Sequence, residues 1–122
     1  TYGFISPGYY DPDTPEDPAL FKSGWPNGKS WETPVNEICA PCSYRTTAEE
    51  YVKNEFSYQY NGAGGLSWGI PYAAGVCALG WQVNPGLSAQ EMKGFLLKSA
   101  YITNEGVRVI NPAGLIDMIK SM

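Results

Sequence analysis

Histidine is absent from this chain of 122 residues, and its absence limits the chemistry that the chain can perform alone. Histidine is the usual general base for a serine or cysteine nucleophile, and it is a common zinc ligand. A serine nucleophile activated by histidine therefore cannot be complete within these residues. Any candidate serine is either structural or belongs to an enzyme whose base lies elsewhere.

Cysteine is scarce, and the three residues present, Cys39, Cys42 and Cys77, are too few and too irregularly spaced for a disulfide scaffold. Cys39 and Cys42 have the spacing of a redox motif, in which a helix start lowers the pKa of one thiol. A zinc site would lack two of its four ligands. We expect no metal and no cofactor, and we favour two thiols at the end of a strand over a redox pair.

Basic residues are also few, with 8 Lys and Arg against 12 Asp and Glu, for a net charge of −4. This balance disfavours nucleic acid and anionic membrane surfaces as partners. The acidic segment from Asp11 to Asp17 lacks the glycine and spacing of a helix-loop-helix calcium site, so we expect a solvated loop. The chain starts at Thr1 without a charged and apolar leader, so we expect no targeting signal and a natural start upstream.

Charged residues are missing altogether between Glu55 and Glu91, and the centre of this stretch is apolar. The run approaches the length of a membrane span. However, it contains several glycines and Pro71, and it lacks flanking Lys or Arg anchors. We expect no membrane span, and instead a helix from about Ser67 to Val83 that is hydrophobic all round and therefore buried in a larger fold.

The length suits one domain, but the composition changes near residue 35. Residues 1–34 contain six prolines with scattered glycines, which predicts an irregular segment with at most short pieces of strand. An alternative is a small carbohydrate-binding domain with a sugar-stacking surface. The aromatic residues that would form this surface are Tyr9, Tyr10, Trp25 and Trp31.

Residues 35–122 have a more regular pattern of strands and helices. Alternation and composition predict short strands at Val35–Ala40, Phe56–Tyr60 and Val107–Ile110. Ser88 and Glu91 form a capping box that starts a second helix at Ala89. Its buried face contains apolar residues at helical spacing, namely Met92, Phe95 and Leu96.

A terminal helix is predicted after the last of these strands. Asn111 is a good N-cap, and Pro112 suits the first helical position. Leu115, Ile116 and Ile119 then recur at the spacing of one inward face.

Ser67 is the candidate nucleophile. Residues 65–69 fit Gly-x-Ser-x-Gly, the strand-to-helix turn of α/β-hydrolases, in which the acid and the histidine follow the serine. No histidine follows here. In the other known order the acid and the histidine come before the serine, so a chain without the start of its domain keeps the nucleophile and loses the base. The structural alternative for Ser67 is an ordinary helix N-cap.

Residues 65–75 resemble the nucleophile motif of the subtilases, Gly-Thr-Ser-x-Ala-x-Pro-His-Val-Ala-Gly. The chain matches this motif at Gly65, Ser67, Pro71, Ala74 and Gly75. It departs from it with Leu66 for threonine, Gly69 for alanine, Tyr72 for histidine and Ala73 for valine.

The resemblance continues in register on both sides of the motif, from about Val35 to the end. Asn84-Pro85 with Leu87-Ser88 resembles the next turn of the family, and residues 91–100 and 109–111 resemble its following helix and the approach to its last one. Upstream, residues 38–41 resemble a strand that ends in Ala-Pro-Gly, with Cys42 in place of the glycine.

The resemblance implies that residues 35–122 are the C-terminal part of a subtilisin-like three-layer α/β fold with a mostly parallel sheet. Ser67 would be the catalytic nucleophile of a serine endopeptidase that acts on peptides or proteins. The family's Asp, His and oxyanion-hole Asn would lie in a missing N-terminal part of the same domain. We expect the chain alone to be inactive and to self-associate. The alternative is a non-catalytic binding or regulatory domain of the same shape.

Overall fold

The chain forms a mixed α/β structure, which confirms the predicted class. The structure is a computed structural model that describes residues 3–26, 37–62 and 64–122. Its first sheet has the strand order β2-β1-β3-β7-β6, and β4 and β5 form a separate pair. The strands are β1 (Ile5–Tyr9), β2 (Lys22–Ser23), β3 (Ile38–Pro41), β4 (Arg45–Glu49), β5 (Ser57–Asn61), β6 (Tyr101–Ile102) and β7 (Arg108–Val109). The helices are a short 3₁₀ helix η1 (Pro18–Leu20), α1 (Leu66–Val83), α2 (Ala89–Lys98) and α3 (Pro112–Lys120).

The larger sheet is mixed, so the expectation of a mostly parallel sheet is wrong for the described residues. β3 pairs in parallel with both β1 and β7 at its centre. The two edge strands, β2 and β6, pair antiparallel with their neighbours. β6 and β7 are joined by a tight turn in which Gly106 has a φ of 80°. A connection this short can only reverse the chain, and it therefore makes that edge antiparallel.

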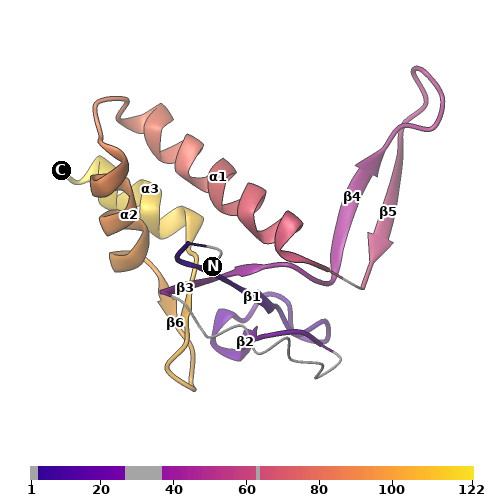
Figure 1. Ribbon diagram of the computed structural model, residues 1–122, viewed down its shortest axis with the longest axis horizontal. Helices are drawn as coiled ribbons and strands as arrows, with labels where there is room; N and C mark the ends of the chain where they lie inside the picture. Colours follow the sequence, from indigo (N-terminus) through magenta and orange to yellow (C-terminus); the bar gives the residue numbers. More distant parts are fainter. Residues whose placement is uncertain (1–2, 27–36, 63) are drawn as a thin grey trace.

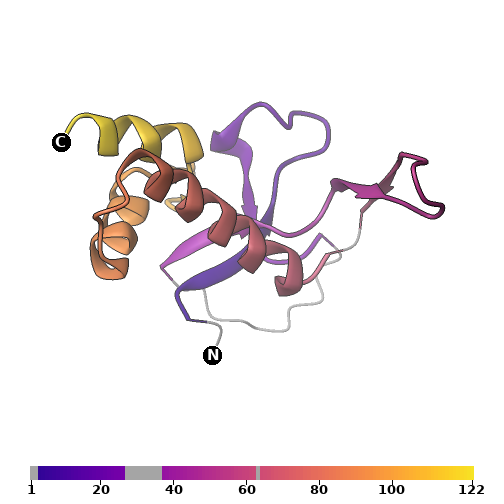
Figure 2. The same ribbon diagram turned by 90° about the horizontal axis from the view of Figure 1, so that it is seen from above.

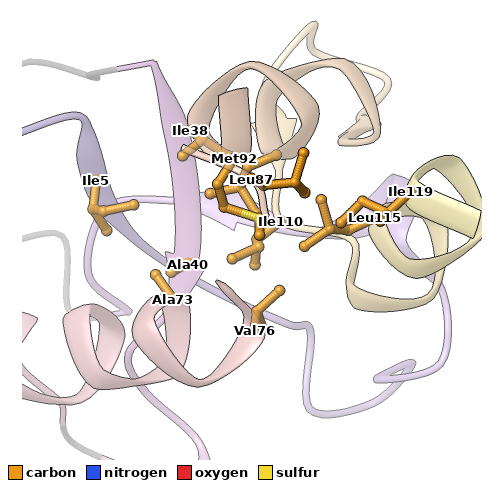
Figure 3. Packing of buried hydrophobic residues seen from close by; sticks show 11 residues of the cluster. Ile5, Ile38, Ala40, Ala73, Val76, Leu87, Met92, Ile110, Leu115 and Ile119 are labelled. Atoms are coloured by element: carbon orange, nitrogen blue, oxygen red, sulfur yellow. The ribbon is translucent and has the colours of Figure 1, made fainter. Parts of the chain in front are cut away.

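Both faces of β3 are buried, and this explains its continuous apolar sequence. Ile38 and Ala40 belong to the main core with residues of α1, α2 and α3, and Figure 3 shows the packing of this core. Cys39 points to the opposite face, where it packs with Phe21 and Val109. Strands covered on both faces read as apolar runs rather than as alternating patterns. Within the described residues, the second face is covered by the segment around Phe21 and not by a second helical layer.

The N-terminal segment contributes more to the sheet than its prolines predict. β1 is five residues long and lies between β2 and β3, although it contains Pro7. Gly8 allows close approach, because a Cβ atom there would overlap the ring of Phe21. The prediction of at most short pieces of strand therefore underestimated this segment. The expected start of the next strand at Val35, and Trp31 of the proposed sugar surface, lie outside the described residues.

The predicted central helix is present as α1, and in this chain it is buried on one face, while its burial on every side in a larger fold stays a prediction. Its buried residues lie on one face that packs against the sheet and α3: Gly69, Ala73, Val76 and Gly80. Figure 1 shows α1 along the outer margin of the body, with the sheet and α3 on its inner side. Large apolar side chains on the remaining surface of α1 are exposed: Trp68, Ile70, Tyr72, Leu79 and Val83. The described residues supply cover for only one face.

The helices α2 and α3 begin as the sequence predicts. The Ser88 hydroxyl accepts a hydrogen bond from the Glu91 N–H at 3.1 Å, and the Glu91 carboxylate accepts one from the Ser88 N–H at 2.8 Å. The Asn111 side chain accepts a hydrogen bond from the Gly114 N–H at 3.0 Å and so caps α3. Of the residues expected on the inward faces, Met92, Leu96, Leu115 and Ile119 are buried, and Phe95 and Ile116 are half-buried.

The β4–β5 hairpin connects β3 to α1 and projects away from the body of the molecule (Figures 1 and 2). The expected strand at Phe56–Tyr60 is confirmed as β5. Tyr58 and Tyr60 lie opposite Ala48 and Thr46 of β4, and both tyrosine side chains are exposed. The hairpin therefore sets the path by which the chain leaves the sheet and enters α1.

Candidate functional site

Ser67 is the second residue of α1, and its side chain is exposed. The N-cap is Gly65, so the structural alternative of Ser67 as an ordinary N-cap is wrong. The Trp68 N–H bonds back to the Gly65 carbonyl at 3.0 Å, which closes the tight turn that carries the serine. The Ser67 hydroxyl therefore lies on the surface in the first helical turn and does not cap the helix.

The turn that carries Ser67 lies at the carboxyl ends of the parallel strands β1 and β3. Cys42 directly follows β3, and its N–H donates to the carbonyl of Gly8 near the end of β1 at 2.9 Å. On the other side, Cys42 contacts Gly64 and Gly69, which flank Ser67 in the chain. The carboxyl ends of parallel strands are the usual place for ligand sites in α/β folds. Ser67, the nucleophile predicted from the sequence, therefore lies where an α/β fold usually binds its ligand.

The first turn of α1 also provides main-chain donors. The N–H groups at a helix start have no intrahelical acceptor, and the helix dipole makes this end partly positive. The N–H of Ser67 belongs to this set, so it is placed to hydrogen-bond a negatively charged oxygen beside the hydroxyl. Pro71 has no N–H to offer the carbonyl of Ser67 four residues earlier.

Arg45 is a residue of this site that sequence reasoning missed. Its guanidinium lies 3.9 Å from the centre of the Trp68 ring, directly after the serine. Its Nη1 donates to the Cys42 carbonyl at 3.3 Å. Arg45 opens β4 and is distant in sequence from Ser67, and no spacing pattern connects the two. The contact is visible only because the hairpin brings the chain back to the end of β3.

No side chain near Ser67 on α1 can act as its base at neutral pH. Burial, assisted by Tyr101, raises the pKa of Tyr72, and burial raises the pKa of Cys77. Both groups therefore keep their protons under these conditions. The sequence has no histidine, so α1 itself supplies no group that could accept the Ser67 proton.

The two cysteines at the end of β3 are structural thiols. Both are free and buried, and the predicted placement at the end of a strand is confirmed. Burial, with a smaller contribution from Cys42, raises the pKa of Cys39 to about 11. Burial also raises the pKa of Cys42, although hydrogen bonds from Gly8 and Gly69 and the charge of Arg45 act in the other direction. Redox cysteines need a lowered pKa, so the redox interpretation loses its basis.

The acidic loop uses its carboxylates for local turns. Asp11 accepts the N–H of Asp13 at 2.9 Å, and Asp17 accepts the N–H of Ala19 at 3.0 Å. Across the part of the chain that the structure describes, no three acidic, cysteine or histidine side chains come together as a metal site.

Two of the aromatic residues predicted for the sugar surface, Tyr9 and Tyr10, pack edge to face with other rings. The rings of Tyr9 and Tyr44 are 5.6 Å apart at 66°, and those of Tyr10 and Phe21 are 4.9 Å apart at 83°. Sugar stacking uses exposed ring faces, which these contacts do not arrange side by side. No helix in the described ranges is both long enough and apolar enough to cross a bilayer.

Comparison with known proteins finds solved structures with a similar fold. No protein-family model matches the chain, and no curated protein matches it. One of these structures is the A-subunit of the AB5 toxin from E. coli, with 26% sequence identity and a TM-score of 0.51. The match covers 70% of this chain and 28% of the toxin subunit. The chain is therefore similar to a small part of a much longer polypeptide.

Proposed function

We propose that this chain is the C-terminal part of the catalytic domain of a subtilisin-like serine endopeptidase, with Ser67 as its nucleophile. The observation that carries the proposal is the position of Ser67, exposed in the first turn of α1 at the carboxyl ends of β1 and β3. A nucleophile at a strand-to-helix junction has both an accessible hydroxyl and main-chain donors beside it. The motif match at residues 65–75 supports the same assignment.

In this proposal the reaction is divided between the chain and a missing N-terminal part of the same domain. The Ser67 Oγ attacks the carbonyl carbon of a peptide bond in a peptide or protein substrate. A histidine of the missing part accepts the Ser67 proton and then gives it to the leaving amine. The Ser67 N–H helps to hold the negative oxygen of the tetrahedral intermediate. Water then releases the acyl group from Ser67.

Two further observations support a role within a longer domain. The outer face of α1 exposes large apolar side chains that additional strands and helices would cover. The chain also spans only 28% of the length of the toxin subunit that it resembles in fold. The departures at Leu66 and Tyr72 leave a second candidate, a non-catalytic binding domain of the same shape.

The test compares the chain alone with the polypeptide encoded together with its upstream sequence. A fluorophosphonate probe should not label Ser67 in the isolated chain, because no base is present, and the missing oxyanion side chain alone costs roughly 10²- to 10³-fold in rate. In the longer protein, Ser67→Ala should lower kcat for a peptide substrate by about 10⁴- to 10⁶-fold. Ser121→Ala, at the exposed end of α3, is the matched control.

Each outcome has a clear meaning. Probe labelling of the pure isolated chain would refute the division of the catalytic groups. A longer protein that hydrolyses peptides and keeps its activity in the Ser67→Ala variant has another nucleophile. A longer protein that binds peptides without cleaving them would favour the non-catalytic candidate.

A further inference from the structure

Two departures of this chain from the subtilase pattern lie in contact with each other. Cys42 takes the place of the glycine in Ala-Pro-Gly, and Gly69 takes the place of an alanine two residues after the serine. A Cβ atom on Gly69 would lie 2.5 Å from the Cys42 Sγ, closer than real Cβ contacts come. A glycine at position 42 would leave room for the methyl group of an alanine at position 69. In this chain the Cys42 thiol occupies that room.

The Cys42 side chain has little freedom to move away from this contact. It is fully buried, and its Sγ donates to the Ala40 carbonyl at 3.5 Å. A Cβ atom on Gly69 would also approach Ala40, at 3.7 Å from its Cβ and 3.8 Å from its carbonyl oxygen. The sizes of Cys42 and Gly69 are therefore matched where β3 and α1 meet. In a close-packed interior, adding even one methyl group at this contact would be destabilising.

Cys42 contacts the turn that carries Ser67 at two points, one before and one after the serine in the chain. Its carbonyl lies against Gly64, where any Cβ atom would overlap that carbonyl, and its thiol lies against Gly69. The same carbonyl accepts the Arg45 hydrogen bond, and Arg45 stacks on Trp68. Since Gly64 and Gly69, which lie on either side of the serine in the chain, are both next to Cys42, a shift of Cys42 shifts the turn.

We propose that Cys42 and Gly69 form a compensating pair that positions Ser67, with Cys42 as a positioning residue that does not touch the substrate. The proposal rests on the proposed function only for its catalytic consequence. The pairing itself is a property of the present chain. It makes Gly69 intolerant of a side chain as long as Cys42 is present.

The first experiment is a double-mutant cycle on this chain. Gly69→Ala should lower Tm by roughly 5 °C or more because of the overlap, and Cys42→Gly should lower it by a similar amount because of the void. The double variant should recover most of the combined loss. The matched control is Gly75→Ala on the same helix, where a Cβ atom meets nothing within 4 Å, so Tm should stay the same or rise. Additive losses in the double variant would overturn the pairing.

The second experiment measures position and not stability. In ¹H–¹⁵N spectra, Cys42→Gly, which is distant from the turn in sequence, should shift the amide signals of Leu66 and Ser67, and the double variant should return them toward the original values. A purely structural role would lower Tm and leave these signals unchanged, and this result would overturn the positioning role. Gly75→Ala should leave both signals in place.

The third experiment uses the longer protein and separates the two proposals. Gly69→Ala should lower kcat by roughly 10-fold or more with little change in KM, because small displacements of reacting groups are costly, and the added Cys42→Gly should restore it. If the longer protein has no activity, the proposed function fails while the cycle and the spectra still decide the pairing. If kcat is unaffected although the pair is coupled in stability, the positioning role is wrong.

Discussion

The helices α1 and α2 follow each other in the chain, yet they are built for different surroundings. α2 has a side-chain capping box, a charged outer surface and a buried stripe that contains Met92 and Leu96. α1 has no side-chain cap, carries no charged residue and exposes large apolar side chains on its outer face. The outer surface of α2 is polar and suits contact with water, whereas the outer surface of α1 is apolar and suits the interior of a protein. The difference indicates where the fold is complete and where it requires a partner.

The largest expected effect comes from the same substitution made in each helix. Leu96 is fully buried in α2, whereas Leu79 is 44% exposed on the outer face of α1. Leu96→Ala should destabilise this chain by about 2–5 kcal/mol, because it leaves a cavity in the main core. Leu79→Ala should change stability by less than about 0.5 kcal/mol. Urea unfolding of both variants measures the difference, and equal losses would show that the outer face of α1 is already covered in solution.

The second expected effect concerns association of the chain through the outer face of α1. At micromolar concentration the isolated chain should form dimers or larger species, because the exposed apolar side chains and the open sheet edges favour contact between copies. Replacing both Ile70 and Leu79 by lysine should weaken association by at least about tenfold, since each buried apolar side chain contributes roughly 1.5–3 kcal/mol. Light scattering gives the mass of the species.

The control for association is Gln90→Lys, which adds a charge to the exposed surface of α2. It should leave the mass distribution as it is. If the original chain is a stable monomer that unfolds cooperatively, the exposed apolar face of α1 does not drive association, and this prediction is wrong.

The smallest expected effect is electrostatic and concerns the start of α2. Hydrogen bonds from the backbone and side chain of Ser88 lower the pKa of Glu91 from its ordinary value of 4.5. The charged carboxylate therefore contributes stability above its unfolded-state pKa, and this contribution is lost as the pH falls through the lower folded-state pKa. The Tm difference between the original chain and Glu91→Gln should be largest near pH 7 and shrink toward pH 3. A difference that does not change with pH would contradict this.

The sequence predicted the elements whose signals are local. The capping box at Ser88, the N-cap at Asn111 and the apolar run of α1 each act within a few residues, and the structure confirms all three. The strand at residues 56–60 followed from simple alternation. These features depend on backbone hydrogen bonds and side-chain spacing, which neighbouring residues determine.

The features that the sequence did not predict depend on distant contacts. Pro7 and Gly8 argue against a strand, yet β1 lies inside the sheet because Ile5 and Ser6 pair with residues of β3. The composition of α1 predicted an apolar helix, but which of its faces is covered depends on the elements around it. At the candidate site, the motif located Ser67, but the role of Arg45 depends on the path of the hairpin.

The order of strands in the sheet has a consequence for folding during synthesis. β3 pairs with β1 from early in the chain and with β7 from near its end, and Cys39 lies opposite Val109. The centre of the sheet therefore cannot close until almost all of these residues have left the ribosome, and such distant pairing makes folding slow. During this interval α1 is present without β7 and α3, which are the last strand and the last helix of the chain. The buried face of α1 therefore stays exposed in the nascent chain until α3 is available to cover it.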